Sequence, residues 1–222
     1  MDGQNSKIGQ RRRAAKSDSR ASYNARRQEI LQAAASVFNR LGLKGASLSA
    51  VASEMGVDRA TLYYYFSSKE QLFDEIVRSV VEENERFALR IAESDISASD
   101  KLRELIVAFM QSYAENYPFL YIYIREDLSH VSEKRSAWSE HMTSLNRSIE
   151  KSVIKIIEEG FEDGSMQYIG SARTVAYAVL GMLNWSHRWF RPGRSEGAAQ
   201  IANTFADFAL KGLISAEQAF AK

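Results

Sequence analysis

Residues 59–66 are the part of this sequence whose side chains are best suited to hold a nucleic acid. A guanidinium, a threonine hydroxyl and three consecutive phenols lie close together there. Such groups donate hydrogen bonds to phosphate oxygens and to base edges. Leu62 and Phe66, four residues apart, would hold the opposite face of a helix against a core. The side chains expected to face the partner are Arg59, Thr61, Tyr63, Tyr64 and Tyr65.

Two short helices joined by a glycine turn would position these side chains. Ser47 is a suitable N-cap for a helix over 48–55, because its hydroxyl can accept a hydrogen bond from a free N–H of the first turn. Gly56 follows that helix, and a tight interhelical turn commonly needs a positive φ. A second helix is predicted over 59–65. Residues 47–66 therefore fit a helix-turn-helix, in which the second helix enters the major groove of DNA.

With these residues in place, the chain resembles the TetR family of bacterial regulators over about residues 24–84. The matching positions are Ala52, Gly56, Val57, Thr61, Leu62, Tyr63, Tyr64, Tyr65, Phe66, Ser68, Lys69, Glu70 and Leu72. The resemblance implies an all-α homodimer that binds operator DNA. It implies that Ser47 and Tyr65 hold phosphates, that Ser49 lies near the groove, and that base edges or phosphates are contacted by Arg59, Thr61, Tyr63 and Tyr64. Lys69, which opens the next helix, would bind a phosphate through its charge and nearby free amides.

Three positions depart from the family's pattern. Ala50 stands where an acidic residue is common, and Asp58 and Ala60 stand where Ser and Gly are common. Asp58 can still cap a helix, but its charge is unfavourable near phosphate, so the operator preference stays open. The tyrosines also have a second interpretation, in which they pack partly in the domain core. We expect Tyr63 to be half-buried.

Charge is distributed unevenly along the 222 residues. Residues 1–70 carry 12 Lys and Arg against 6 Asp and Glu, and residues 71–222 carry 17 against 22, so a segment of +6 precedes one of −5. A basic N-terminal third favours contact with a polyanion. Residues 1–22 have no apolar face and are interpreted as a flexible basic arm. This arm either reaches the minor groove or the phosphates of DNA, or it remains solvated.

Apolar spacing predicts an all-α fold of about nine helices. Ile30, Ala34, Val37 and Phe38 mark the first helix, which is expected at about 23–41 and should end at Gly42. Further helices are predicted at 69–92, around the stripe from Leu102 to Tyr113, at 119–123 where a strand is the alternative, at 133–159 with its end at Gly160, at 171–190 and at 196–213. The resulting domains are a DNA-binding domain over 23–84 and an effector-binding and dimerisation domain over 85–222.

The motifs of common enzyme classes are absent from the sequence. It contains no P-loop, no G-x-G-x-x-G and no G-x-S-x-G, and it has no cysteine. Glu126 and His130, four residues apart, would bind a metal or form an exposed pair, whereas His141 and His187 have no companion at ligand spacing. We therefore expect no catalytic residue, cofactor or metal. No apolar stretch approaches the roughly 20 residues of a membrane span, so a cytoplasmic location is expected.

Two-fold symmetry is expected, since a palindromic operator mirrors the symmetry of a dimer. The helices at 171–190 and 196–213 would pair with their symmetry mates and hold the two reading helices about 34–36 Å apart. The last helix carries an apolar stripe that suits either this interface or the core of the chain itself. Its members are Ile201, Phe205, Phe208, Ala209 and Leu213.

Residues 183–193 resemble a stretch near the end of TetR-type repressors of fatty-acid and steroid catabolism, whose effectors are often acyl-CoA thioesters. This resemblance implies a hydrophobic effector that releases the operator, bound by Phe109, Tyr113, Trp138, Met142, Tyr177, Trp185 and Arg188. Arg188, Arg191 and Arg194 would meet the phosphates of coenzyme A, or be solvated while Trp185 and Trp189 pack the dimer interface. An architectural DNA-binding protein without an effector is the alternative, although about 140 C-terminal residues exceed what a dimerisation clamp needs.

Overall fold

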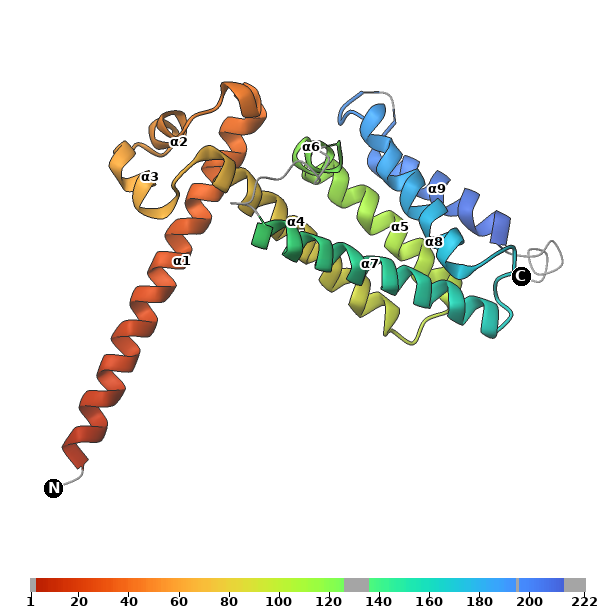
Figure 1. Cartoon of the computed structure of the whole chain (residues 1–222), viewed down its shortest axis with the longest axis horizontal. Coiled ribbons are helices and arrows are strands. Elements are labelled where there is room, and N and C mark those ends of the chain that lie inside the picture. Colours follow the sequence, from red (N-terminus) through yellow and green to blue (C-terminus); the bar gives the residue numbers. More distant parts are fainter. Residues whose placement is uncertain (1–2, 126–135, 195, 214–222) are drawn as a thin grey trace. The chain divides into compact units, whose positions relative to one another are not determined.

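The computed structural model of the protein describes the backbone of residues 3–125, 136–194 and 196–213, with side chains from Arg20 to Ile124, Trp138 to Arg194 and Glu196 to Leu213. Within these ranges the chain forms nine α-helices and no strand, which confirms the all-α prediction (Figure 1). The chain divides into two compact units, residues 1–76 and 77–222. The division falls inside α4 (Lys69–Ala92), eight residues before the predicted boundary at 84/85.

The first unit contains α1 (Gly3–Gly45), α2 (Leu48–Met55), α3 (Arg59–Tyr65) and the first two turns of α4. The bounds of α2, α3 and α4 agree with the prediction. Its core is built from the apolar stripe of α1 and from single anchors on the other helices, all of which are at most 3% exposed. They are Ile30, Ala34, Val37, Phe38, Val51, Ala52, Leu62, Phe66 and Leu72.

The helix α1 begins at Gly3, well before the expected start at residue 23. Residues 3–22 contain no proline and many alanine, arginine, lysine and glutamine residues, which favour a helix. A helix already nucleated by the buried stripe extends at little cost. The use of residues 1–22 as an arm stays a prediction. Gly42 has φ 69° and interrupts the helical geometry, as predicted, before a last turn that ends at Gly45.

The second unit contains the rest of α4 and five further α-helices: α5 (Ala98–Glu115), α6 (Phe119–Arg125), α7 (Ser136–Glu162), α8 (Ala172–Trp185) and α9 (Ala198–Leu213). The central helix is α5, which packs against α7, α8 and most extensively α9 (Figure 1). The predicted stripe from Leu102 to Tyr113 forms its buried face. Residues 119–125 are helical, which decides between helix and strand.

Two helix ends differ from the prediction. Gly160 does not end α7, which continues to Glu162. A side chain at this glycine would come within 2.7 Å of Cγ and Sδ of Met166, so the glycine allows a close approach of the following loop. The helix predicted at 171–190 ends at Trp185, and Ser186–Arg188 form a 3₁₀ turn. The Glu126 and His130 pair lies outside the described residues.

Lys101 fixes the C-terminal end of α4. Its ammonium donates to the carbonyl oxygen of Ala92 at 3.1 Å and forms an ion pair with Glu159 at 2.7 Å, and its side chain is 8% exposed. One buried cation thus satisfies the last carbonyl of α4 and joins α5 to α7.

Candidate functional site

The turn between α2 and α3 has the geometry predicted from its residues. Ser47 Oγ accepts a hydrogen bond from the Ala50 amide at 3.2 Å and caps α2. Gly56 adopts φ 65°, the left-handed conformation that glycine tolerates best. Asp58 precedes α3 but makes no side-chain cap. Ser47 and Ser49 are both exposed, so their hydroxyls lie on the surface beside α3.

The helix α3 buries one face and exposes the polar one. Leu62 is fully buried, whereas Tyr63 and Tyr64 are 47% and 73% exposed. Tyr63 is therefore more exposed than the half-buried position that was expected, and Tyr65 is the partly buried tyrosine of the three. Arg59 donates to the Tyr63 hydroxyl at 2.6 Å and lies over its ring, so the two side chains form one exposed group. Tyr65 is partly buried because its ring packs on Tyr23 of α1, 4.9 Å between centroids. The half-buried Thr61 completes the predicted set on α3, Arg59, Thr61, Tyr63, Tyr64 and Tyr65.

Arg27 of α1 holds the C-terminal end of α3. Its guanidinium donates to the Tyr65 carbonyl at 3.0 Å, forms an ion pair with Glu75 of α4 and lies 4.2 Å from the centre of the Phe66 ring. These contacts join α1, α3 and α4 within the first unit. No sequence pattern indicates this role, because the partners of Arg27 lie on α3 and α4, far along the chain.

Lys69 has hydrogen-bond partners inside the first unit, and its role as a phosphate ligand stays a prediction. Its ammonium donates to the carbonyl oxygens of Leu43, Lys44 and Ala46, at 2.9, 3.2 and 3.2 Å. An ammonium has three N–H donors, and all three are directed to the backbone between α1 and α2. The side chain is therefore occupied inside the unit, because the end of α1 leaves carbonyls that need donors.

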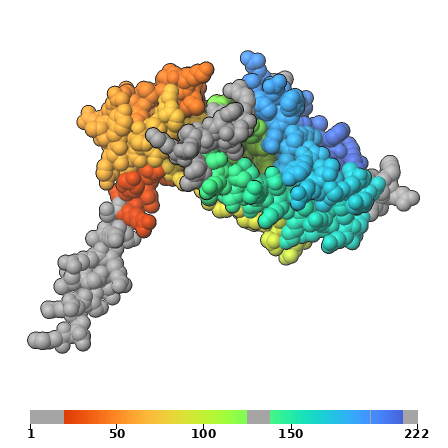
Figure 2. Space-filling view, viewed as in Figure 1, coloured from red at the N-terminus to blue at the C-terminus, as the bar shows by residue number. Residues whose placement is uncertain are grey.

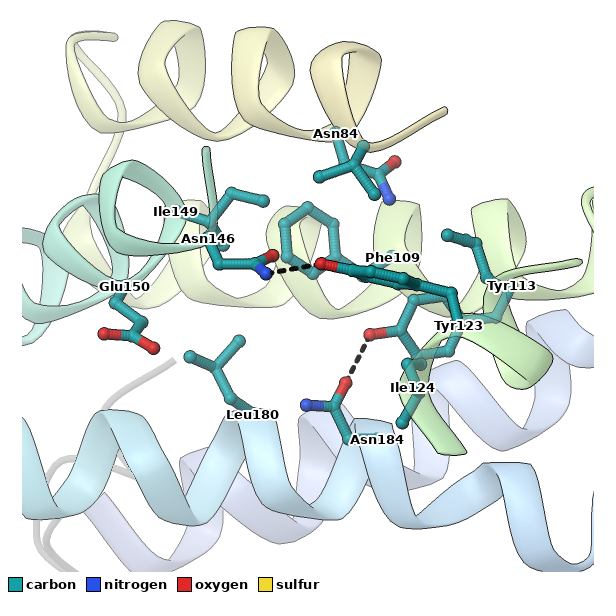
Figure 3. Close-up of a pocket in the computed structure, with 12 residues that line it drawn as sticks. Asn84, Phe109, Tyr113, Tyr123, Ile124, Asn146, Ile149, Glu150, Leu180 and Asn184 are labelled. Atoms are coloured by element: carbon teal, nitrogen blue, oxygen red, sulfur yellow. Dashed lines mark hydrogen bonds between the residues drawn. The ribbon is translucent and has the colours of Figure 1, made fainter. Parts of the chain in front are cut away.

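The second unit contains a cavity of about 280 Å³ between five helices (Figure 3). Its apolar wall comes from Val81, Phe109, Leu120, Ile124, Ile149 and Leu180. Its polar wall comes from Asn84 of α4, Tyr113 of α5, Tyr123 of α6, Asn146 and Glu150 of α7, and Asn184 of α8. Ligand cavities commonly combine an apolar surface with a few convergent polar groups.

Two hydrogen bonds order the polar wall. Tyr113 donates to Asn184 Oδ1 at 2.6 Å, and Asn146 Nδ2 donates to the Tyr123 hydroxyl at 2.8 Å (Figure 3). Burial raises the pKa of both the Tyr113 and the Tyr123 phenol above its ordinary value. Both phenols therefore stay protonated and neutral at physiological pH.

The seven residues predicted to contact an effector are divided between this cavity and other places. Phe109 and Tyr113 line it. Met142 is fully buried in the core, and Trp138 packs against Tyr123 at 6.0 Å between ring centres. Tyr177, Trp185 and Arg188 do not line the cavity: the Tyr177 hydroxyl lies 3.5 Å from Glu150, and Arg188 stacks on Trp185, which is 60% exposed.

The three asparagines of the cavity, Asn84, Asn146 and Asn184, are not among the residues predicted to bind an effector. Asn84 lies between Glu83 and Glu85, and Asn146 precedes Arg147, so neither stands out in the sequence, whereas Asn184 is a polar residue between Leu183 and Trp185. The pattern at Asn184 is a usable signal, because polar side chains on the inner face of a helix are commonly hydrogen-bonded or line a cavity.

A second, apolar hollow lies along α8 and α9. It measures about 540 Å³ and is lined by Ile169, Val175, Ala178, Val179, Met182, Phe208, Ala209, Lys211, Gly212 and Leu213. The stripe predicted on the last helix is divided: Ile201 and Leu213 are buried in the chain's own core, whereas Phe208 is 75% exposed. Figure 2 shows α8, in blue, at the surface of the unit.

The described histidines have partners within the protein. His141 lies 3.0 Å from Glu82, and His187 Nδ1 lies 2.8 Å from the Asn184 carbonyl oxygen. Among the described residues, no three acidic, histidine or cysteine side chains come together in a way that would hold a metal ion. In the same part of the chain, every helix is too short or too polar to cross a bilayer.

Two family models match the chain. Residues 30–76 match "Bacterial regulatory proteins, tetR family", and residues 95–213 match "Tetracyclin repressor-like, C-terminal domain". A similar relative is the HTH-type transcriptional repressor KstR2 of Mycobacterium tuberculosis, which is 26% identical over 191 residues, 86% of this chain and 94% of the relative. Its solved structure, described as a ketosteroid transcriptional regulator, has a TM-score of 0.72 at 22% identity and covers 86% of this chain and 95% of its own.

Two further solved structures share the fold. The TetR family regulator PfmR of Thermus thermophilus is 28% identical, with a TM-score of 0.71 over 84% of this chain and 99% of its own. AibR, solved with isovaleryl coenzyme A and operator DNA, is 20% identical, with a TM-score of 0.67 over 82% and 97%. The named relatives are transcriptional regulators, which are not enzymes. The two models together cover the helix-turn-helix and most of the second unit, and the chain belongs to the TetR family of DNA-binding transcriptional regulators.

Proposed function

We propose that this protein is a dimeric repressor that binds a palindromic operator and leaves it when a small effector enters the cavity of the second unit. One observation carries the proposal: Val81 and Asn84, which line the cavity, belong to α4. The same helix carries Lys69 and Glu75, which hold the helix-turn-helix through the ends of α1 and α3. An effector that binds more tightly to one position of α4 therefore changes operator affinity by linkage.

Operator recognition is assigned to the exposed side of α3 and the start of α2. Arg59, Thr61, Tyr63 and Tyr64 would contact base edges or adjacent phosphates, while Tyr65, Ser47 and Ser49 would contact the backbone beside the groove. The bond from Arg59 to Tyr63 supports this assignment, since it extends the guanidinium along the exposed side of the helix. Lys69 contributes through the helix that it opens rather than through its ammonium.

The dimer would form through α8 and α9. The apolar hollow along these helices and the exposed ring of Phe208 support this, because a self-complementary interface needs an apolar patch. Pairing there would set the two copies of α3 about one helical turn of DNA apart, about 34–36 Å.

The effector would be mainly apolar, and an acyl-CoA thioester is the leading candidate. A cavity of about 280 Å³ is near the lower limit of ligand sites. It would therefore take a modest acyl group and leave coenzyme A outside. Arg188, Arg191 and Arg194 are exposed and available to phosphates. AibR, which has the same fold, binds isovaleryl coenzyme A. The protein would act in the cytoplasm, without turnover and without a cofactor.

Footprinting upstream of the protein's own gene, followed by a gel-shift titration, tests the proposal. We expect one palindromic site to be bound in preference to random DNA, and a short-chain acyl-CoA to release it. The same thioester should stabilise the protein by about 2.7 kcal/mol at a hundred times its Kd. Binding that ignores sequence, or release by no thioester, acid or related metabolite, would contradict it.

A further inference from the structure

We infer that the cavity receives an uncharged group that forms hydrogen bonds, and that it rejects a carboxylate. The inference rests on the proposed function, because it names the chemistry of the effector for the same cavity. It concerns the part of the effector that is enclosed, whatever lies outside.

The charges that line the cavity disfavour a carboxylate. Among the described residues that line it, Glu150 is the single acidic side chain, and no lysine, arginine or histidine contributes. The Tyr113 and Tyr123 phenols are neutral because burial raises the pKa of each. A carboxylate placed here would lose its hydration, meet no cation and share the space with another carboxylate.

The hydrogen-bonding groups left free in the cavity favour a ligand oxygen. Tyr113 occupies Oδ1 of Asn184, which leaves the two N–H donors of that amide. The Tyr123 oxygen accepts from Asn146, so its own proton can be donated. These donors come from α8 and α6 and suit one carbonyl or hydroxyl oxygen, but they oppose a cation.

Glu150 and Asn84 are further polar groups that a ligand can contact. Figure 3 shows Glu150 at one end of the cavity and Asn184 near its middle, with Leu180 between them. Among the described contacts, Glu150 accepts only a long bond of 3.5 Å from Tyr177. It can therefore accept a hydrogen bond from a ligand hydroxyl. Asn84 makes no hydrogen bond within the described part of the chain. Its amide can therefore bind a ligand oxygen, and that contact would act directly on α4, the helix that carries Asn84. The ligand class is a neutral molecule with a carbonyl oxygen and an apolar body.

Three probes built on one 4-ethylcyclohexyl ring test the inference: 4-ethylcyclohexanone, 4-ethylcyclohexanecarboxylate and 4-ethylcyclohexylamine. Binding to the full chain is measured by ligand-observed NMR and thermal shift at millimolar concentration. We expect the ketone to bind at least about tenfold more tightly than the carboxylate, since one uncompensated charge in a partly dry site costs that much or more. We expect the amine to bind no more tightly than the ketone, because pairing with Glu150 is offset by the lost hydration of both charges. Tighter binding of either charged probe, or binding of none of the three, would overturn the inference.

Two variants locate the effect. Glu150→Gln should raise carboxylate affinity at least about tenfold and so reduce the preference for the ketone over the carboxylate. Glu158→Gln, on the same helix but exposed and outside the cavity, is the matched control and should change neither. Equal responses of the two variants would refute the role of Glu150. Gel shifts on the same proteins distinguish a failure of this inference from a failure of the proposed function. If the carboxylate binds and releases the operator, only this inference is contradicted. If the ketone binds but no ligand releases the operator, the proposed function is contradicted.

Discussion

Replacing Lys69 by methionine distinguishes the two roles that this residue can have. The substitution keeps most of the side-chain length and removes the ammonium, which donates to the carbonyl oxygens of Leu43, Lys44 and Ala46. If the ammonium serves the backbone, the loss falls on folding. If it serves a DNA phosphate, the loss falls on binding and on its salt dependence.

The expected loss of stability follows from the bonds. A hydrogen bond to a charged group contributes roughly 1.5–3 kcal/mol. The three bonds share one ammonium in a partly exposed place, and water can replace some of them. We therefore expect a total loss of about 2–3 kcal/mol rather than the sum. For a chain of this size that lowers Tm by roughly 4–12 °C.

The assay combines thermal unfolding without DNA with operator binding at several salt concentrations. Lys69→Met should unfold earlier while the slope of log K against log salt stays the same, since each phosphate contact contributes about 0.9 to that slope. Lys44→Met is the matched control, because this neighbouring lysine is exposed and its ammonium makes no hydrogen bond among the described residues. An unchanged Tm together with a slope reduced by about 0.9 would refute the structural role of Lys69.

Four further substitutions test other parts of the molecule. Arg59→Ala should relax operator preference by about 1–3 kcal/mol at one base pair, and an unchanged affinity in a gel shift would remove α3 from the reading role. Arg27→Met should lower Tm and the ratio of operator to random-DNA affinity, because the end of α3 loses its anchor, whereas Arg26→Met on the exposed side should change Tm little. Phe208→Glu should turn the dimer into a monomer in ultracentrifugation at micromolar concentration, since a carboxylate is costly in an apolar interface; a persistent dimer places the interface elsewhere. Gly160→Ala should lower Tm by crowding Met166, at a cost of about 1–3 kcal/mol, whereas Gly181→Ala meets open space and should not.

Local signals made the helix-turn-helix predictable from the sequence. Ser47 marks the start of α2, and Gly56 marks its end through a conformation that few other residues adopt. Leu62 and Phe66 then identify the buried face of α3, which leaves Arg59, Tyr63 and Tyr64 outside. Each of these inferences depends on residues within about two helical turns of one another. The interactions that cause the caps and the buried face act over the same short distance along the chain, so a local sequence pattern reveals them.

The partners of the cations were not predictable in the same way. The sequence predicts a phosphate contact for Lys69 and no role for Arg27, yet both side chains donate to backbone carbonyls about 25 to 40 residues away. A carbonyl has no residue type, so no pattern reveals that it needs a donor. The cavity has the same difficulty, because Asn84, Asn146 and Asn184 come from three helices and meet only after the bundle has formed.

Under the proposed function, α4 would act as a lever whose fixed end is the last carbonyl of the helix, to which Lys101 donates. Asn84 lies about 12 Å along the helix from Ala92, and Lys69 lies about 35 Å from it, at 1.5 Å per residue. A sideways displacement at Asn84 is therefore magnified about threefold at the first turn, provided that the helix does not bend. This magnification depends on where along α4 the ligand makes contact. A ligand that contacted α4 nearer to Ala92 would need a smaller movement to displace the first turn by the same distance, but it would have to exert a larger force.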